Sequence, residues 1–250
     1  MIKCNYIEGV VGLQYRELKI FIILKKDISL QDCGYTIGKF ISSAMAKNKE
    51  LLDMHNCNMY KNYTYDNLYP IATNSLYLSN SIYTFRIHSI DNNLMNKLRE
   101  ELSGFENNIA KVMGIEDIVY KQKPIDGIFT VTPVIVTLPK DEYGKINFSD
   151  CFGIQDIIIK QLVRKYSKFT GQYIKEEDAK AMFTCFNVAS SPISLNYKGI
   201  KLTGIKIEAI VAPDKLSQSL AFFGLACGLG EKTSTLGTGF TIRSSRRGES

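Results

Sequence analysis

The sequence predicts an α+β protein in which a β-α-β-β-α-β unit occurs twice along its 250 residues. Two observations carry this prediction. Apolar residues at helical spacing alternate with short apolar runs in the same order in each half of the chain, and 45% of the residues are apolar, which is enough to fill real cores. This order is that of the ferredoxin-like (RRM-like) unit. We therefore expect two tandem ferredoxin-like domains, residues 1–124 and 125–250, divided near residues 122–127.

The first half contains two predicted helices and a set of predicted strands. An apolar run bounded by charge predicts a buried strand at 18–24, and Asp27 or Ser29 offers an N-cap for a helix at 33–47. Asp91 caps a second helix, whose apolar residues continue at spacings of three and four to Val112, with Gly114 as its end. The other elements are expected as an extended aromatic segment at 61–71, a hairpin of strands 75–78 and 82–87, and a closing strand at 115–120.

The second half repeats this order. Pro133 interrupts a strand expected at 129–138 and predicts an edge or a bulge there. A change in the apolar alternation across Gly204 predicts a bulge within a strand at 200–211. The other elements are expected as helices at 152–169 and 214–227 and as strands at 182–188, 193–196 and 239–243.

The composition limits the classes of partner. The net charge is +6, and residues 180–250 hold nine Lys or Arg against four Asp or Glu, a basic excess that permits nucleic-acid binding. The six cysteines form no CxxC pair and show no spacing of metal ligands, so we expect free thiols, no metal and no cofactor. No apolar run approaches the ~20 residues of a membrane span, and no signal peptide is recognised. These observations predict a cytoplasmic protein without a membrane partner.

The most constrained backbone is expected in the glycine-rich stretch 224–242. Four of its glycines form two clusters around a polar bend, Gly228 and Gly230, then Gly237 and Gly239. GLGEKT differs from a nucleotide-binding P-loop, because Glu231 precedes Lys232 and the loop follows a helix C-terminus, where the macrodipole repels phosphate. Glycines allow the backbone to approach a partner closely and Lys232 adds a cation, which favours an anionic polymer. The alternative is a tight interdomain turn that only packs.

GLGEKTSTLGTGFTI resembles the C-terminal glycine-rich motif of the RAMP superfamily, and specifically of the CRISPR repeat-processing endoribonucleases, which cut precursor crRNA. That motif consists of Gly-apolar-Gly, a polar bend, and Gly-x-Gly running into the last strand. The resemblance implies the two-domain architecture expected above, and it implies CRISPR repeat RNA as the partner. It assigns RNA binding to the four glycines and to Lys232.

The sequence contains two histidines, so candidates for proton transfer near pH 7 are few. His88 lies in the expected hairpin beside Arg86, and we expect it at the hairpin surface. MHNCNMYKNYTYDNLYP resembles the catalytic segment of the same family. The resemblance implies that His55 is the general acid and that Lys61, six residues later, is the cation that stabilises charge on the phosphate.

The family's reaction needs no metal, since a ribose 2′-hydroxyl attacks the adjacent phosphate and leaves 2′,3′-cyclic phosphate and 5′-hydroxyl ends. The protein has to supply an acid, a base and a cation. Many family members carry a tyrosine on the first helix, but the matching position here is Phe40, which has no proton to transfer. Tyr35 and Ser43 lie on the same helix as other candidates for the base, and positioning of the 2′-hydroxyl is a further source of rate.

The helix expected at 152–169 carries a cationic stripe made of Lys160, Arg164, Lys165 and Lys168. Such a stripe is usually a solvated face, whereas beside RNA it can follow phosphates, and we assign RNA binding to Lys160, Arg164 and Lys168. Aromatic residues make up 11% of the chain and are expected to stack on bases.

The leading hypothesis is a metal-independent endoribonuclease that acts on repeat RNA as a monomer or homodimer. One alternative is a non-catalytic RAMP subunit that binds guide RNA within a CRISPR effector complex. Another is an unrelated binding module built on ferredoxin-like domains.

Overall fold

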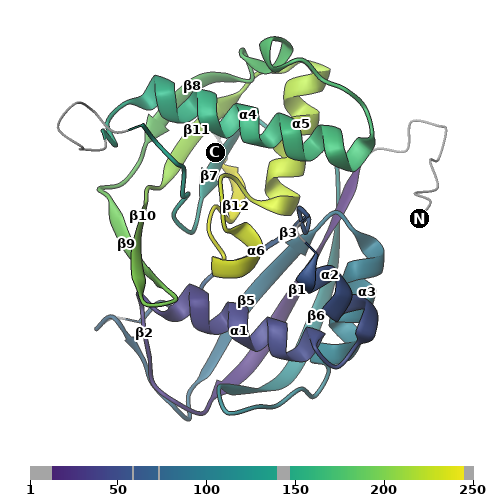
Figure 1. The fold of residues 1–250 in the computed structure, drawn as a ribbon, viewed down its shortest axis with the longest axis vertical. Coiled ribbons are helices and arrows are strands. Elements are labelled where there is room, and N and C mark those ends of the chain that lie inside the picture. The colour runs from purple at the N-terminus through teal and green to yellow at the C-terminus, as the bar shows by residue number, and fades with distance from the viewer. Residues whose placement is uncertain (1–12, 58, 73, 140–146, 245–250) are drawn as a thin grey trace, which may run out of the picture.

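The structure of this chain is a computed structural model that describes residues 13–57, 59–72, 74–139 and 147–244. Within these residues, two four-stranded sheets and the helices against them form the two ends of the molecule along its long axis (Figure 1). The first half of the chain, in purple to teal, occupies one end, and the second half, in green to yellow, occupies the other. The predicted α+β class is confirmed.

The first sheet is antiparallel and has the strand order β3-β5-β1-β6. Its strands are β1 (Gln14–Leu24), β3 (Tyr63–Tyr65), β5 (Ile82–Ser89) and β6 (Ala110–Lys121). β1 contains the predicted buried strand and begins four residues earlier. Its residues Leu18, Ile20 and Ile22 are fully buried, because every second side chain of a strand faces the same side of the sheet.

Helices α1 (Cys33–Met45) and α3 (Asn92–Leu102) bury their apolar sides in the same core as β1. The Asp91 side chain accepts a hydrogen bond from the Leu94 backbone N–H, which confirms the predicted N-cap of α3. The predicted end of this helix is wrong. α3 stops at Leu102 because Gly104 adopts a left-handed φ of +64°, and Val112 belongs to β6 instead.

The connections around α1 also differ from expectation. The Asp27 carboxylate accepts a hydrogen bond from the Ser79 backbone N–H, and α1 begins after Asp32, so Asp27 and Ser29 are not its N-cap. β4 (Leu76–Tyr77) pairs with β2 (Ile28–Ser29), whereas β5 pairs with β1 and β3, so the predicted hairpin of 75–78 and 82–87 is wrong. The buried Tyr77 side chain of β4 packs edge-on against the Tyr83 ring of β5, with 5.3 Å between ring centres.

The second sheet is also antiparallel and has the order β12-β7-β11-β8. Its strands are β7 (Gly127–Thr130), β8 (Phe183–Val188), β11 (Ile207–Val211) and β12 (Thr241–Ser244). β7 ends before Pro133, and beyond it Val134 and Ile135 make only isolated bridges, so the predicted strand at 129–138 is too long.

Two helices pack with this sheet, α4 (Cys151–Thr170) and α5 (Lys215–Cys227), and a short 3-10 helix, η1 (Glu176–Ala179), follows α4. Both α-helices lie where the apolar spacing predicts them. The Asp214 side chain accepts a hydrogen bond from the Ser217 backbone N–H and caps α5.

A separate two-stranded ribbon consists of β9 (Ile193–Tyr197) and β10 (Ile200–Gly204). β10 and β11 belong to different sheets, so Gly204 ends a strand and is not the predicted bulge within one. A Cβ atom at Gly204 would lie 2.8 Å from the Val134 carbonyl oxygen, which explains the need for glycine there. The last short helix, α6 (Thr233–Leu236), packs on α1.

The two halves share a core. α5 contacts β3 and β5 of the first sheet, and Tyr15 and Ile90 of the first half join the apolar cluster of the second half. His88 is 2% exposed at this junction, so its predicted surface position is wrong. Its Nε2 lies 2.6 Å from Glu17 Oε2 and its Nδ1 lies 2.9 Å from the Leu225 carbonyl oxygen. The second half covers this face of β5, and the local alternation of apolar and polar residues cannot reveal that contact.

Candidate functional site

Helix α2 (Lys49–Asn56) carries the candidate acid His55 in its last turn. The Asn48 side chain caps its start by accepting hydrogen bonds from the Glu50 and Leu51 backbone N–H groups. Leu51 is the one fully buried side chain of this helix. A single buried position gives little apolar periodicity, which explains why the sequence patterns indicate no helix here.

The structure brings His55 and Lys61 together. The Lys61 ammonium donates a hydrogen bond to the His55 backbone carbonyl oxygen, with a distance of 2.6 Å from Nζ to O. This carbonyl is among the last four of α2, which lack partners within the helix, so Lys61 caps the helix C-terminus. The spacing of six residues is therefore explained by a contact that also places a cation beside the imidazole.

The His55 imidazole lies in a partly buried and positive environment. Burial, followed by the charges of Lys61 and Lys198, lowers the pKa of His55 below its usual value. Its Nδ1 atom is buried and has no hydrogen-bond partner among the described residues. Burial of an unpaired polar atom costs about 1–3 kcal/mol, so a ligand that pairs with Nδ1 or brings negative charge is favoured here.

The strand after Lys61 connects this pair to the glycine-rich stretch. The Thr233 hydroxyl donates a hydrogen bond to the Tyr63 carbonyl oxygen, at 3.4 Å, and the Tyr63 hydroxyl donates one to the Ser234 carbonyl oxygen, at 3.0 Å. β3 thus lies between the His55 and Lys61 pair and the polar bend of the second half.

The glycine loop, which we define as residues 228–239, is tightly packed. Its four predicted RNA-binding glycines are all buried and all have a φ between +64° and +75°. A Cβ atom at Gly237 would lie 2.6 Å from the Tyr65 ring, and one at Gly239 would overlap the Leu229 backbone. Gly228 and Gly237 thus pack against β3 of the first half, whereas Gly230 and Gly239 pack within the second half, and packing alone requires glycine at all four positions.

Lys232 is the exposed cation of this loop. Its Nζ lies 5.3 Å from the centre of the Tyr197 ring, and the Lys198 Nζ lies 5.5 Å from the same ring. The Tyr35 ring packs edge-on against Tyr197, with 5.5 Å between ring centres. Helix α1, the β9-β10 ribbon and the glycine loop therefore meet in one cationic, aromatic cluster.

The other candidate bases on α1 have different surroundings. Phe40 is fully buried and packs against Phe85 and Phe105, so this position belongs to the core. The Ser43 hydroxyl donates a hydrogen bond to the Lys39 carbonyl oxygen, at 2.8 Å. Of the named candidates, Tyr35 is the one that packs against the cationic cluster.

The structure separates the cationic stripe of α4 into two parts. The Lys160 ammonium pairs with Asp156, at 2.6 Å, and Arg164 pairs with Glu176, at 3.0 Å. Lys168 instead lies over the Tyr60 ring, with its Nζ 5.6 Å from the ring centre. Tyr60 directly precedes Lys61 in the chain. The Tyr60 contact joins the two halves, and no local pattern in the sequence reveals it.

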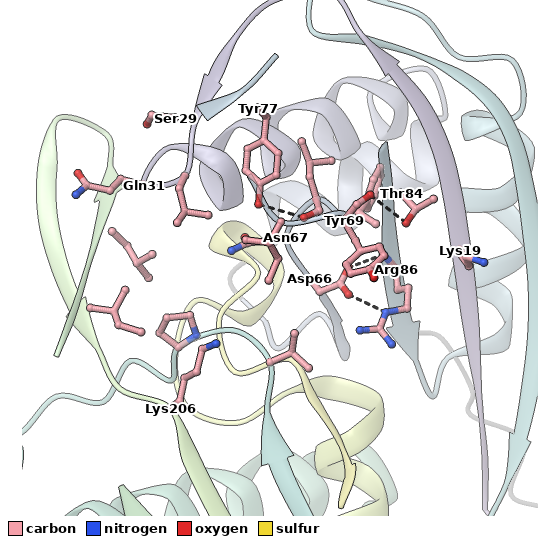
Figure 2. A pocket seen from close by; sticks show the side chains of 18 of the residues that line it. Lys19, Ser29, Gln31, Asp66, Asn67, Tyr69, Tyr77, Thr84, Arg86 and Lys206 are labelled. Carbon is pink, nitrogen blue, oxygen red and sulfur yellow. Dashed lines mark hydrogen bonds and ion pairs between the residues drawn. The ribbon is translucent and has the colours of Figure 1, made fainter. Parts of the chain in front are cut away.

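A cavity of about 810 Å³ lies between the halves, lined by both (Figure 2). Asp66 and Arg86 form an ion pair of 2.7 Å on one side, and Lys206 of the second half lies on the opposite side. Burial raises the pKa of Asp66, although Arg86 acts in the opposite direction. The predicted site residues, all of them within the described part of the chain, do not line this cavity, so it is separate from the His55 and Lys61 pair.

Two further observations concern classes of ligand and location. Among the described residues, no three His, Cys, Asp or Glu side chains are grouped so that they could hold a metal ion. The helices in the same part of the chain are all too short or too polar to cross a membrane.

No protein-family model matches this chain, and no curated protein matches it. Solved structures do match. CRISPR-associated protein Cas6 aligns with a TM-score of 0.68 and 17% identity, over 92% of this chain and all of that one. A Cas6-related protein from Pyrococcus furiosus gives a TM-score of 0.68 and 17% identity, over 93% of this chain and all of that one. A RAMP protein that binds different RNA substrates aligns with a TM-score of 0.69 and 16% identity, over 92% of this chain and all of that one.

The chain therefore has the fold of the CRISPR-associated RAMP proteins, over nearly its whole length. Within that class its fold is Cas6-like, as the resemblance of the glycine loop and the His55 segment predicts.

Proposed function

We propose that this chain is a cytoplasmic, metal-independent endoribonuclease that cleaves CRISPR repeat RNA, built from two tandem ferredoxin-like domains, 1–124 and 125–250. Each sheet has the first and third strands of its unit in the centre, which supports that architecture. The observation that carries the function is the contact between the Lys61 ammonium and the residue that bears the candidate acid, His55. The solved structures of Cas6 with cleaved product support the substrate class.

The proposed reaction exchanges one phosphorus–oxygen bond for another. The ribose 2′-oxygen forms a bond to the adjacent phosphorus, and the bond from phosphorus to the 5′-oxygen of the next nucleotide breaks. His55 gives its proton to this leaving oxygen, and Lys61 stabilises the negative charge of the phosphorane. The proton of the 2′-hydroxyl goes to a base, for which Tyr35 is the better placed of the two candidates on α1 and Ser43 the other.

The charges around His55 favour a proton on this imidazole only when RNA is bound. The free protein favours neutral His55, because burial, Lys61 and Lys198 all lower the pKa of this imidazole. A phosphate placed between the imidazole and the two ammonium groups raises this pKa, because an opposite charge nearby favours the protonated ring. Binding of the substrate therefore favours the uptake of a proton from solvent by His55, which then acts as the acid.

The deciding experiment is incubation of repeat RNA with the protein in EDTA, with the end groups of the products identified. We expect 2′,3′-cyclic phosphate and 5′-hydroxyl ends, and a rate loss of about 10²–10⁴-fold for His55→Ala. Asp53→Asn, an exposed change on the same helix, is the matched control and should cleave normally. A requirement for Mg²⁺, or full activity of His55→Ala, would contradict the proposal.

A second candidate is a non-catalytic RAMP subunit that binds guide RNA within a CRISPR effector complex. Phe40 favours it, because the position of the family's tyrosine is filled by a buried side chain without a proton. The role of Lys61 as a helix cap also accounts for that lysine without catalysis. Tight binding of repeat RNA with no cleavage, by a correctly folded protein, is the outcome that selects this function.

A further inference from the structure

Tyr60 is an exposed aromatic side chain immediately before Lys61. Its exposed fraction is 47%, although tyrosine rings in a folded protein usually gain free energy by burial. The backbones of Tyr60 and Lys61 are one peptide apart, about 3.8 Å between Cα atoms. The ring is therefore attached directly beside the lysine that caps the helix carrying His55.

Two lysines of the second half lie near this ring. The Lys168 Nζ lies 5.6 Å and the Lys165 Nζ 6.0 Å from the centre of the Tyr60 ring. Ammonium groups within about 6 Å of a ring centre are attracted to its face. Both lysines come from one turn of α4, so they fix the orientation of an otherwise exposed side chain.

Lys165 also connects this ring to the glycine loop. Its ammonium donates a hydrogen bond of 2.6 Å to the Gly230 carbonyl oxygen. Burial lowers the pKa of Lys165 to about 8. A lysine that is desolvated and already bonded to backbone has a structural position, whereas Lys168 is exposed and carries its charge towards solvent.

An exposed, oriented ring with adjacent cations has the composition of a single-strand nucleic-acid subsite. Aromatic faces stack on bases of any sequence, and lysines pair with the phosphates on either side. The ion-paired members of the stripe, Lys160 and Arg164, lack this arrangement because their charges are already balanced by Asp156 and Glu176.

We propose that Tyr60, held by Lys165 and Lys168, is a stacking subsite for the nucleobase next to the scissile phosphate. Tyr60 is a positioning residue: it holds the neighbouring nucleotide so that the phosphate meets His55 and Lys61. This inference rests on the proposed cleavage of repeat RNA for the identity of that nucleotide, but the stacking itself can be measured without cleavage.

The first test compares Tyr60→Leu with Tyr60→Phe on repeat RNA. Phenylalanine keeps the aromatic face, so Tyr60→Phe should cleave and bind as the unchanged protein does. Tyr60→Leu should weaken binding and lower kcat/KM by at least about fivefold, since base stacking on an aromatic ring contributes that much. Tyr173→Leu, at another exposed tyrosine, is the matched control and should change neither.

The second test identifies the base. One nucleotide at a time is replaced by an abasic nucleotide around the cleavage position. When the abasic nucleotide is at the stacked position, kcat/KM of the unchanged protein should fall by the same factor of at least about fivefold. On this RNA, Tyr60→Leu should then lower kcat/KM no further. A merely structural role of Tyr60 would lower the rate equally on every RNA, and that result would overturn the inference.

The third test separates this inference from the proposed function. A 2-aminopurine nucleotide is placed at the stacked position of an RNA with a 2′-deoxy group at the cleavage site, which blocks the reaction. Its fluorescence should be quenched by the unchanged protein and by Tyr60→Phe, but not by Tyr60→Leu. Quenching without any cleavage of ordinary repeat RNA would support the stacking subsite and contradict the proposed nuclease function. Cleavage with equal quenching by all three proteins would support the nuclease function and contradict the stacking subsite.

Discussion

The His55 segment, residues 49–57 and 59–61, and the glycine loop, residues 228–239, lie on the two sides of β3 and are built in opposite ways. The glycine loop is largely buried, and its glycines contact β3 and the backbone of the second half so closely that no Cβ atom fits. The His55 segment buries one side chain of α2 and leaves an imidazole nitrogen without a partner. The glycines of the motif that is most specific in sequence are thus required by packing, and the less regular segment leaves an imidazole nitrogen available to a substrate.

This comparison predicts that the largest effect of a substitution is a loss of stability in the glycine loop. Gly239→Ala places a Cβ atom against the Leu229 backbone at a φ of +64°, so we expect the free energy of unfolding to fall by about 4 kcal/mol. Gly104→Ala is the matched control, because it has the same φ with no atom within 4 Å, and should cost about 1 kcal/mol. Urea unfolding of both variants measures the difference. Equal losses would mean that the loop is not closely packed.

In the His55 segment we expect a change in rate rather than in stability. Lys61→Gln keeps a hydrogen-bond donor for the end of α2 but removes the positive charge. Loss of one preorganised stabilising group costs about 10²-fold in cleavage rate, whereas loss of one hydrogen bond changes stability by about 1 kcal/mol.

Single-turnover cleavage and thermal unfolding of Lys61→Gln and Lys61→Arg test this separation. Lys61→Arg should retain more activity than Lys61→Gln because it keeps the charge. A glutamine variant with normal cleavage would leave Lys61 as a helix cap alone.

The pH dependence should show a smaller effect. The pKa of His55 is lowered from its usual 6.5, so folding favours the neutral ring. This contribution to stability is present above about pH 6.5 and is lost as the pH falls through the lowered, folded-state pKa. As the general acid, His55 must be protonated, so kcat/KM should fall with rising pH, with its midpoint below 6.5.

An NMR titration of the His55 ring measures this pKa in the free protein and with uncleavable 2′-deoxy RNA. We expect the RNA to raise it. A pKa at or above 6.5 in the free protein would contradict the environment described here.

The smallest effect is predicted on α4. Lys160 is neutralised by Asp156, so Lys160→Ala should leave RNA affinity and its salt dependence nearly unchanged. Lys168→Ala should weaken binding and reduce the salt slope by about 1, as loss of one phosphate contact does. Fluorescence anisotropy between 50 mM and 200 mM salt is a suitable measurement. Equal effects of the two changes would show that the whole stripe contacts RNA.

Local signals were sufficient for most of the elements. The side chains of Asp91 and Asp214 indicate where α3 and α5 begin, because these caps lie within a few residues of chain, and the apolar run at 18–24 indicates the strand β1 but not its start. The end of α3 is misjudged because apolar residues of β6 continue the helical spacing by coincidence past Gly104.

The site shows the same division between local and distant contacts. The contact of Lys61 with the end of α2 spans six residues, and the resemblance names both His55 and Lys61, but it does not indicate this contact. The burial of His88 depends on Glu17 and Leu225. The position of Tyr60 depends on Lys165 and Lys168 of α4, which are more than 100 residues away in the chain. Only the folded arrangement of the two halves reveals these contacts.

The apolar cluster that contains Tyr15 and Ile90 together with the second half has a consequence for unfolding. α5 rests on β3 and β5, so separating the halves would expose apolar surface on both and leave the buried Glu17 and His88 pair in contact with water. Heating should therefore produce one cooperative calorimetric transition rather than two, and a fragment cut near residue 124 should aggregate instead of behaving as an autonomous folding unit.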